Sequence, residues 1–520
     1  MKRSMELMAV AAVVLLFGFA SSAPAQRLVS PGVPVPRTPG VSVPVPVAPP
    51  NTGVGRVYVP MSSITIPGSA GVIAHTNIEV FVPDGFQPNA ITPPFGGFGY
   101  NTPASIACRY RVMSGTHQAG CNPNNSLLTN TSGGSGTIAI VDAFDDPWIG
   151  EDLNYFMTEF GITGTGTFQV VYASGTEPPF DVPPYDVNGD GGWELEESLD
   201  VEYARAMAPN ANIVLVEAKS NSYTDLLQAV GVASNEVICG ATTCPSGGSG
   251  KGEVNMSWGS GEFSGETSYD ANFTATNVVY FAASGDSPGV SYPCASPNVV
   301  CVGGTTVSKY PSATPGGIAF NNSQEGPWDS SGGGSSIYEN IPNYQNVLAN
   351  TLQALNNSTA TTPTGSEYGV GLSTTNRAVP DLAANANPNT GYWVFDSFQF
   401  ALLGYIPPAS DAPDEGGWWI VGGTSAATPV VAGIVNLAGS TNTITSGVTN
   451  SGGTFQASSA AELAKIYSNI TSAFPGAVNA ANFQDVLPGF GVCGPYQGYT
   501  AITGWDPCSG IGVPLGVGGL

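Results

Sequence analysis

The sequence predicts an α/β fold whose mostly parallel sheet is covered by helices on both faces. From residue 137 onward, short apolar segments alternate with helical segments, which is the pattern of repeated strand–helix–strand units. The 520-residue chain is 42% hydrophobic and only 10% charged, so it can bury a large core. Its 68 glycines and 43 prolines suit short strands joined by tight turns and surface loops.

Each element of this pattern follows from local sequence. Apolar runs predict buried strands at residues 137–142, 213–216, 253–258 and 278–283. Helical patterns predict helices near 148–160 and at 194–208, 222–235, 268–276 and 430–438. Pro209 ends the helix at 194–208, because proline cannot continue the hydrogen-bond ladder.

Three segments precede this body, which we place at residues 134–520. Residues 1–25 combine a basic start, a short apolar run and Ala23-Pro24-Ala25, which is typical of a secretory signal peptide. Residues 26–54 are rich in Pro and Val and predict an extended linker. Residues 55–133 alternate in places and predict a few strands. We therefore expect a secreted protein, extracellular or periplasmic, that leaves the membrane once the signal is removed.

The charge is strongly acidic and unevenly distributed. The formal net charge is −25, and from residue 134 onward six Lys/Arg stand against 35 Asp/Glu. Such a surface repels phosphate backbones, which excludes nucleic acid as a partner. The segment before residue 134 instead has more basic than acidic side chains, seven against three, so charge attraction would hold it against the body.

The eight cysteines fall into four near pairs, and oxidising compartments favour disulfides. Sequence alone leaves about 105 connectivities open. A zinc site is disfavoured because there is no CxxC pair and no nearby histidine. The expected local pairs are Cys108/Cys121, Cys239/Cys244, Cys294/Cys301 and Cys493/Cys508.

The strongest chemical motif is Gly-Gly-Thr-Ser-Ala-Ala-Thr-Pro at residues 422–429, which opens an apolar helix. It places the Ser425 hydroxyl where free N–H groups and the helix dipole stabilise developing negative charge. A lone Thr-Ser pair would be an ordinary helix N-cap. The full pattern Gly-Thr-Ser-Ala-x-x-Pro is the nucleophile signature of the subtilase clan, so Ser425 is the predicted nucleophile.

A nucleophilic serine needs a base, and the histidines are poorly placed for that role. His75 and His117 both precede the body, which disfavours a Ser-His-Asp triad, although triad members occur in any chain order. Glu196 and Asp200 lie four residues apart, on one face of the predicted helix. In an enclosed site, repulsion would push one of them toward protonation. Spacing alone would equally suit a solvated acidic face.

A third carboxyl follows the strand at 278–283, in Ser284-Gly285-Asp286. Asp286 either caps the turn or, when protonated, donates a hydrogen bond to an oxyanion.

Taken together, these motifs resemble the sedolisin family of serine-carboxyl peptidases, which includes kumamolisin-like and tripeptidyl-peptidase members and has a subtilisin-like fold. The resemblance covers about residues 134–520. Its motifs appear in the family's order: Glu196-x-x-x-Asp200, 206–209, 255–259, 284–286, 302–305, 328–335, 342–345 and 422–429.

The resemblance implies a role for each residue. Glu196 accepts the Ser425 proton, Asp200 orients and supports Glu196, and Asp286 donates to the oxyanion. Gly332, Gly333 and Gly334 would line the substrate cleft. The implied substrates are proteins or peptides, with endopeptidase and tripeptidyl-peptidase action both open, and we expect a monomer. A carboxylate base predicts activity at acidic pH, roughly 3 to 5.

The resemblance also implies one calcium ion. Its expected ligands are the carboxylates of Asp485 and Asp506 with backbone oxygens of Val486, Ile502 and Gly504, an all-oxygen set that suits calcium. Residues 487–489 replace a more polar stretch, which bears on the affinity of the site.

Two further motifs have weaker chemical interpretations. Asp142 ends the strand at 137–142, where ordinary subtilisins carry a catalytic aspartate, but no histidine is available for it to orient, so we assign it a structural role. Residues 186–197 satisfy the EF-hand pattern with Glu197 in the twelfth position. Prolines replace the entering helix, and a second calcium there is left open.

Two alternatives remain at this stage. One is a secreted binding or surface protein with an inactive peptidase fold, which the intact site residues disfavour. The other is a neutral subtilisin-like protease with a histidine from the leader. Sedolisins usually carry a propeptide of domain size, so residues 55–133 are interpreted as a reduced propeptide or an added module.

Overall fold

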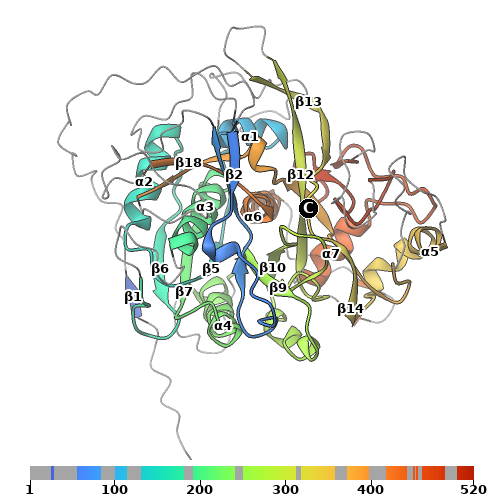
Figure 1. The fold of residues 1–520 in the computed structure, drawn as a ribbon, viewed down its shortest axis with the longest axis horizontal. Helices are drawn as coiled ribbons and strands as arrows, with labels where there is room; N and C mark the ends of the chain where they lie inside the picture. Colours follow the sequence, from blue (N-terminus) through green and yellow to red (C-terminus); the bar gives the residue numbers. More distant parts are fainter. Residues whose placement is uncertain are drawn as a thin grey trace, which may run out of the picture.

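The computed structural model describes residues 25–27, 55–83, 100–113, 130–180, 191–240, 250–311, 318–357, 372–397, 417–441, 449–450, 453–454, 459–486 and 501–520. Its helices are α1 Pro103–Arg109, α2 Ile149–Phe160, α3 Gly191–Met207, α4 Tyr223–Cys239, α5 Ala349–Asn357, α6 Thr424–Thr441 and α7 Ser459–Tyr467 (Figure 1). Short 3-10 segments are η1 Met61–Ser63, η2 Glu266–Ser268, η3 Asp270–Phe273, η4 Asn343–Leu348 and η5 Pro388–Thr390.

A nine-stranded sheet forms the centre of the molecule, in the order β1-β6-β7-β5-β8-β10-β12-β13 with β16 beside β12. These strands are β1 Ala25–Arg27, β5 Thr137–Ala143, β6 Phe168–Tyr172, β7 Asn212–Ala218, β8 Gly252–Met256, β10 Val278–Ala283, β12 Val300–Pro311, β13 Ile318–Pro327 and β16 Leu382–Asn385. From β6 to β12 neighbouring strands are parallel, whereas β1 and β13 add antiparallel edges. The predicted mostly parallel sheet is confirmed.

Both faces of this sheet are covered by helices because successive side chains of a strand point to opposite faces. In β5, Ile138 and Ile140 pack with residues of α2 and α3. Ala139 and Val141, between them in sequence, pack with residues of α4. Helix α6 lies beside α3 in Figure 1, and side chains of both belong to one core cluster. This double covering explains the continuous apolar runs of the strands.

The remaining strands form small sheets around the central one. They are β2 Gly55–Tyr58, β3 His75–Thr76, β4 Glu79–Pro83, β9 Trp258–Gly261, β11 Ser291–Tyr292, β14 Gly334–Asn340, β15 Asn376–Val379, β17 Tyr392–Asp396, β18 Gly417–Gly422, β19 Thr449–Asn450, β20 Gly453–Thr454, β21 Phe483–Gln484 and β22 Val513–Pro514. Two of these sheets mix N-terminal strands with strands of the body, in the orders β17-β18-β4-β2 and β11-β9-β3. The predicted β-rich N-terminal segment is therefore joined to the body by strand pairing.

The helix expected at 430–438 is longer than predicted, since α6 begins at Thr424 and ends at Thr441. The other predicted elements match to within a few residues, with two further differences. The helix expected at 268–276 is wrong, since the chain forms the short segments η2 and η3 there. Asn272 Nδ2 and Thr274 Oγ1 donate to the carbonyls of Tyr269 and Ala271, so these side chains compete with a regular helical ladder. The strand expected at 253–258 is split into β8 and β9 at Ser257.

The predicted disulfides are partly visible. Cys294 and Cys301 are bonded to each other, which confirms one of the four local pairs. Cys108, Cys239 and Cys508 are also disulfide-bonded, and their expected partners lie outside the described residues. In the described part of the chain, no helix has the length and apolar character needed to span a membrane.

Candidate active site

The predicted nucleophile lies where β18 turns into α6. Gly423 occupies this turn with φ +108°, a left-handed conformation that glycine tolerates best. A Cβ atom at this position would lie 2.0 Å from the Asn77 carbonyl oxygen and 2.5 Å from Asp286 Oδ2. The turn therefore requires glycine. The Asn77 and Asp286 oxygens occupy the place that a side chain at position 423 would take.

Ser425 is fully buried in this state, and its hydroxyl faces a carboxyl group. Its Oγ lies 3.0 Å from Glu196 Oε2 and 2.8 Å from the Ser257 carbonyl oxygen. Glu196 comes from α3 and is also fully buried. The structure thus brings together the predicted nucleophile and its predicted base, which are separated by 229 positions in the sequence.

Asp200 lies one turn further along α3, also fully buried, and it is held by two donors. Asn255 Nδ2 lies 2.6 Å from Asp200 Oδ2, and Ser257 Oγ lies 2.8 Å from Asp200 Oδ1. Glu196 Oε1 has no hydrogen-bond partner among the described residues. Asp200 therefore acts on Glu196 through its charge. Its own carboxylate is held by Asn255 of β8 and by Ser257, which lies between β8 and β9.

Asp142, to which the sequence analysis gave a structural role, lies close to these carboxyl groups. It lies at the end of β5 with no exposed surface, and neither carboxylate oxygen has a partner among the described residues. Its charge raises the pKa of Glu196, and the charge of Asp200 in turn raises the pKa of Asp142. The signal in the sequence was an ionisable residue near the end of an otherwise largely apolar strand. Asp142, Glu196 and Asp200 form a cluster of three buried carboxyl groups.

This burial changes how the three groups ionise. Burial first, and then the negative charges of Asp200 and Asp142, raise the pKa of Glu196 well above its ordinary value, while the Ser425 hydroxyl opposes the rise. Burial likewise raises the pKa of Asp200, against the two donors that favour its charged form. Since the groups interact strongly, their protons leave in successive steps whose apparent pKa values belong to the cluster and not to one residue.

Asp286 contacts Thr424, the residue before the serine. Its Oδ1 accepts from the Thr424 backbone N–H at 2.7 Å and from Thr424 Oγ1 at 2.8 Å. Its Oδ2 is buried and has no partner among the described residues. Burial and the charge of Glu79 raise the pKa of Asp286 well above its ordinary value, which favours a proton on Oδ2.

The predicted cleft glycines contact the turn that carries Asp286. The Gly332 N–H donates to the Gly285 carbonyl at 2.8 Å, and a Cβ at Gly332 would lie 2.2 Å from the Ser284 carbonyl oxygen. Gly333 N–H donates to the Gly289 carbonyl at 2.8 Å, and Gly334 has φ +139°. Close backbone approach explains why this stretch is glycine-rich.

An N-terminal strand crosses the nucleophile, a feature that the sequence did not reveal. Thr76 pairs antiparallel with Trp258 of β9. The next residue, Asn77, accepts from the Ser425 N–H at 3.2 Å through its carbonyl, and its own N–H lies 3.2 Å from Ser425 Oγ. Glu79 then pairs with Gly422 in β18. The chain therefore runs between β9 and β18 with one peptide carbonyl directly at Ser425.

Within the described residues, His75 does not serve as a partner of the serine. His75 Nδ1 lies 3.0 Å from the Thr76 carbonyl oxygen, and Nε2 lies 3.3 Å from Thr65 Oγ1. Burial lowers the pKa of His75, so its neutral form is favoured. His117 lies outside the described residues. The geometry favours carboxyl groups as the partners of Ser425.

The residues predicted to bind calcium are partly in view. Asp485 Oδ1 is buried without a partner among the described residues, while Oδ2 accepts from the Gly504 N–H at 2.9 Å. Asp506 is fully buried and accepts from the N–H groups of Ile502, Cys508 and Ser509. The two carboxylates lie close enough that the charge of Asp485 acts on Asp506. An orphaned carboxylate oxygen beside a second buried carboxylate fits a calcium ion.

The comparisons with known proteins agree with this geometry. The model of the subtilase family matches residues 188–466, so the chain belongs to the subtilase family. Kumamolisin from Bacillus sp. (strain MN-32) is 27% identical to this chain over 385 residues, which are 71% of this chain and 57% of that protein. Sedolisin from Pseudomonas sp. (strain 101) is 24% identical over 393 residues, which are 70% of this chain and 53% of that protein.

A third relative and a solved structure extend the comparison. Tripeptidyl-peptidase sed4 from Aspergillus fumigatus is 27% identical over 356 residues, which are 66% of this chain and 49% of that protein. The structure of Pseudomonas sedolisin, a serine-carboxyl proteinase, aligns with a TM-score of 0.50 at 22% identity, covering 80% of this chain and 96% of that one. The chain thus has the sedolisin fold and spans about half the length of the curated relatives it matches.

Proposed function

We propose that this protein is a serine-carboxyl peptidase that hydrolyses peptide bonds in protein or peptide substrates at acidic pH. The observation that carries the proposal is the 3.0 Å contact between Ser425 Oγ and Glu196 Oε2 at the start of α6, with Asp286 bonded to the neighbouring Thr424. An inactive binding protein would have no need to retain all of these buried ionisable groups, because each of them costs stability.

In the proposed reaction, Ser425 Oγ attacks the substrate carbonyl carbon while Glu196 takes the hydroxyl proton. The negative oxygen that forms accepts from the Ser425 N–H and from protonated Asp286 Oδ2. The Asn77 carbonyl oxygen, which accepts from the same N–H, marks where that oxygen would lie. Glu196 then returns the proton to the leaving amine, and water releases the acyl group by the same steps.

The remaining carboxyls hold Glu196 in a usable state. Asp200, fixed by Asn255 and Ser257, repels negative charge on Glu196 and so strengthens it as a base. Asp142 adds a second negative neighbour, and we assign it a positioning role in place of a purely structural one. We expect its replacement by Asn to change the pH profile more than the fold.

The acidic optimum follows from two opposite requirements. Glu196 must lose its proton to act as a base, whereas Asp286 must keep its proton to donate. Burial and like charges raise both pKa values, which shifts both limbs of the profile upward from the values of free carboxyls. We propose that activity is highest on the acidic side of neutrality and declines as Asp286 ionises.

We also propose that residues 55–133 include a reduced propeptide. Support comes from the backbone that connects β3 and β4, which contacts Ser425 at Asn77, where Ser425 has no exposed surface. A substrate cannot reach the serine while this segment is in place. We further propose a signal peptide at 1–25, a linker at 26–54, secretion, and a monomer.

The predicted calcium ion would bind between Asp485 and Asp506, with the backbone oxygens of Val486, Ile502 and Gly504 completing its oxygen ligands. It would supply structural stabilisation only, since it belongs to the C-terminal region and has no part in the proposed proton transfers.

The test is a pH–rate profile for cleavage of a denatured protein by the processed enzyme. We expect an acidic maximum for the wild type and at least a 1,000-fold loss in Ser425→Ala and Glu196→Gln, with unchanged circular dichroism. The matched control is Glu253→Gln, which changes a buried glutamate that contacts Asn436 instead of the serine. A maximum near pH 8, or full activity of Glu196→Gln, would contradict the carboxyl mechanism.

A further inference from the structure

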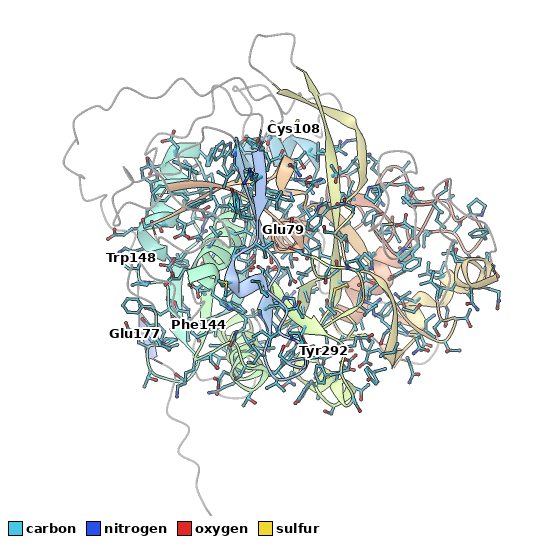
Figure 2. All side chains as sticks on the ribbon, in the orientation of Figure 1. Glu79, Cys108, Phe144, Trp148, Glu177 and Tyr292 are labelled. Carbon is cyan, nitrogen blue, oxygen red and sulfur yellow. A yellow bond between two sulfur atoms is a disulfide. The ribbon has the colours of Figure 1, made fainter. Side chains whose placement is uncertain are left out.

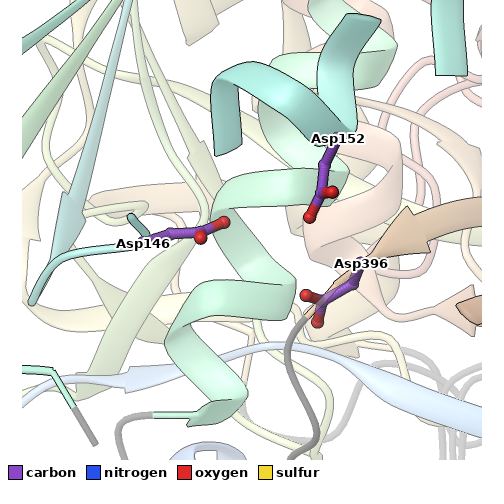
Figure 3. A group of neighbouring side chains, drawn as sticks. All are labelled: Asp146, Asp152 and Asp396. Atoms are coloured by element: carbon purple, nitrogen blue, oxygen red, sulfur yellow. The ribbon is translucent and has the colours of Figure 1, made fainter. Parts of the chain in front are cut away.

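Three aspartates outside the candidate active site converge on a common point. Asp146 follows β5, Asp152 is in the first turn of α2, and Asp396 ends β17. One carboxylate oxygen from each lies within 4.8 Å of the other two. Figure 3 shows the three side chains pointing toward one another across the space between these elements.

All three carboxylates are buried, with at most 1% of each residue exposed. Two of them are oriented by backbone donors, since the Trp148 N–H donates to Asp146 Oδ1 at 2.8 Å and the Ser397 N–H donates to Asp152 Oδ2 at 2.7 Å. Donors of this kind favour the charged form of a carboxylate. The arrangement therefore concentrates negative charge in an enclosed place, which costs free energy unless a cation compensates it.

A fourth buried carboxylate, on α3, lies near the cluster. Glu202 is fully buried, and its Oε2 accepts weakly from the Phe395 N–H at 3.2 Å. Burial raises the pKa of Glu202, and the charges of Asp152, Asp396 and Asp146 act on it in the same direction. Acidic groups from four elements of the fold thus lie near one another.

A second and independent observation comes from Glu197. This residue has no exposed surface, and neither of its carboxylate oxygens has a hydrogen-bond partner among the described residues. Its pKa is raised by burial and by the charges of neighbouring acids, first Glu217 and then Asp146, so its carboxylate lies near an aspartate of the cluster. A buried carboxylate left without any donor points to a ligand that the side chains alone do not provide.

We propose that Asp146, Asp152 and Asp396 bind a divalent cation, and that this cation is calcium. Carboxylate oxygens are hard ligands, and none of the three residues offers the sulfur or nitrogen atom that zinc or copper prefers. The ion would tie the loop after β5 to α2 and to the end of β17. It is distinct from the calcium predicted at Asp485 and Asp506, which lies in the C-terminal region.

The sequence supports this choice of ion. Glu197 is the twelfth residue of the pattern Asp-x-Asn-x-Asp-Gly-x5-Glu, which is typical of calcium-binding loops. Residues 186–190 of that pattern lie outside the described residues and are not assigned as ligands. The sequence pattern left open whether a second calcium ion binds. The proposed site at the three aspartates uses other residues, near Glu197.

The experiment measures calcium binding to the full chain, made with the Ser425→Ala substitution so that it cannot cleave itself. The protein is stripped with EDTA, dialysed, and titrated with calcium chloride in a calorimeter at neutral pH. We expect two bound calcium ions. We expect one ion after Asp506→Asn, one after Asp396→Asn, and none when both substitutions are combined.

A second measurement covers the case in which Asp396→Asn fails to fold. Terbium replaces calcium at oxygen sites. Trp148, whose backbone N–H donates to Asp146, is close enough for its indole to transfer excitation to a terbium ion bound there. Asp506→Asn protein should therefore give terbium luminescence upon tryptophan excitation, and calcium should displace it. Glu253→Gln is the matched control, because it removes a buried carboxylate elsewhere and should bind as many ions as its parent.

Two outcomes would overturn the proposal. One is that folded Asp396→Asn binds as many calcium ions as its parent, with affinity changed less than threefold. The other is that Asp506→Asn shows neither calcium binding by calorimetry nor terbium luminescence. Both results are independent of peptidase activity, since every protein in the series lacks the serine nucleophile.

Discussion

The stability of the contact between the N-terminal strand and the candidate active site should depend on pH because of Glu79. This residue begins β4, two positions after the carbonyl that contacts Ser425. It is labelled near the centre of the molecule in Figure 2. Burial and the charge of Asp329 raise its pKa from 4.5 to about 7. When the strand leaves the site, Glu79 becomes solvated and its pKa returns to its ordinary value.

The sign and size of the effect follow from linkage. Between pH 4.5 and about pH 7 the bound strand retains a proton that the released strand loses, so the bound state becomes less stable as pH rises. Below pH 4.5 Glu79 is protonated in both states, so its contribution to the stability of the bound state is fully retained. At 1.36 kcal/mol per pKa unit, complete ionisation costs about 3.4 kcal/mol, or roughly a 300-fold change in the opening equilibrium. At pH 7, where Glu79 of the bound strand is half ionised, the change is on the order of 100-fold.

The assay is hydrogen exchange of the backbone amides in β4, in Ser425→Ala protein that cannot cleave the strand. At pH 7, Glu79→Gln should protect these amides up to about 100-fold more than its parent, because Gln cannot ionise. At pH 4.5 the two proteins should exchange alike. Glu177→Gln is the control, since Glu177 is exposed and lies far from Glu79 in Figure 2.

Equal protection of Glu79→Gln and its parent at pH 7 would refute this reasoning. So would a difference of the same size at both pH values, because that would indicate a packing effect without proton linkage.

The other predictions concern processing, the serine turn and calcium. Incubation at acidic pH should yield a new N-terminus at Ile78, read by mass spectrometry, because the Asn77 carbonyl lies at Ser425; Ser425→Ala should stay intact, and a different terminus would contradict the geometry. Gly423→Ala should cost about 1–3 kcal/mol in chemical denaturation and at least 100-fold in activity, owing to its positive φ and the clash with Asn77 and Asp286. Gly231→Ala in α4, where a Cβ meets nothing within 4 Å, should be neutral or stabilising. EDTA should lower the melting temperature, and Asp506→Asn should lose part of that response; an unchanged melting curve would argue against bound calcium.

The N-terminal segment shows how composition can mislead about a contact. Its excess of basic residues predicts charge attraction to the acidic body. The residue that it places beside the candidate active site is instead Glu79, whose charge acts on Asp286. Net charge describes the average of a segment, whereas the site is sensitive only to the one side chain that strand pairing brings there.

Local rules were sufficient for the scaffold and for the main chemical groups. Strand β10 begins and ends at the predicted residues, because a continuous apolar run is compatible only with a buried position. Ser425 lies in the first turn of α6, and Glu196 and Asp200 lie one turn apart on α3, as helix periodicity requires. These features depend on residues close in sequence, which is why they could be predicted before any tertiary structure.

Tertiary structure alone decided which groups meet. Asp142, Glu196 and Asp200 form one cluster because β5 lies against α3, and no spacing in the sequence encodes that contact. The Asn77 carbonyl reaches Ser425 through strand pairing across a sequence separation of 348. Asp146, Asp152 and Asp396 converge for the same reason. Burial then sets the chemistry, since a carboxylate that is ordinary in water becomes a strong base or a cation ligand only where the fold excludes solvent.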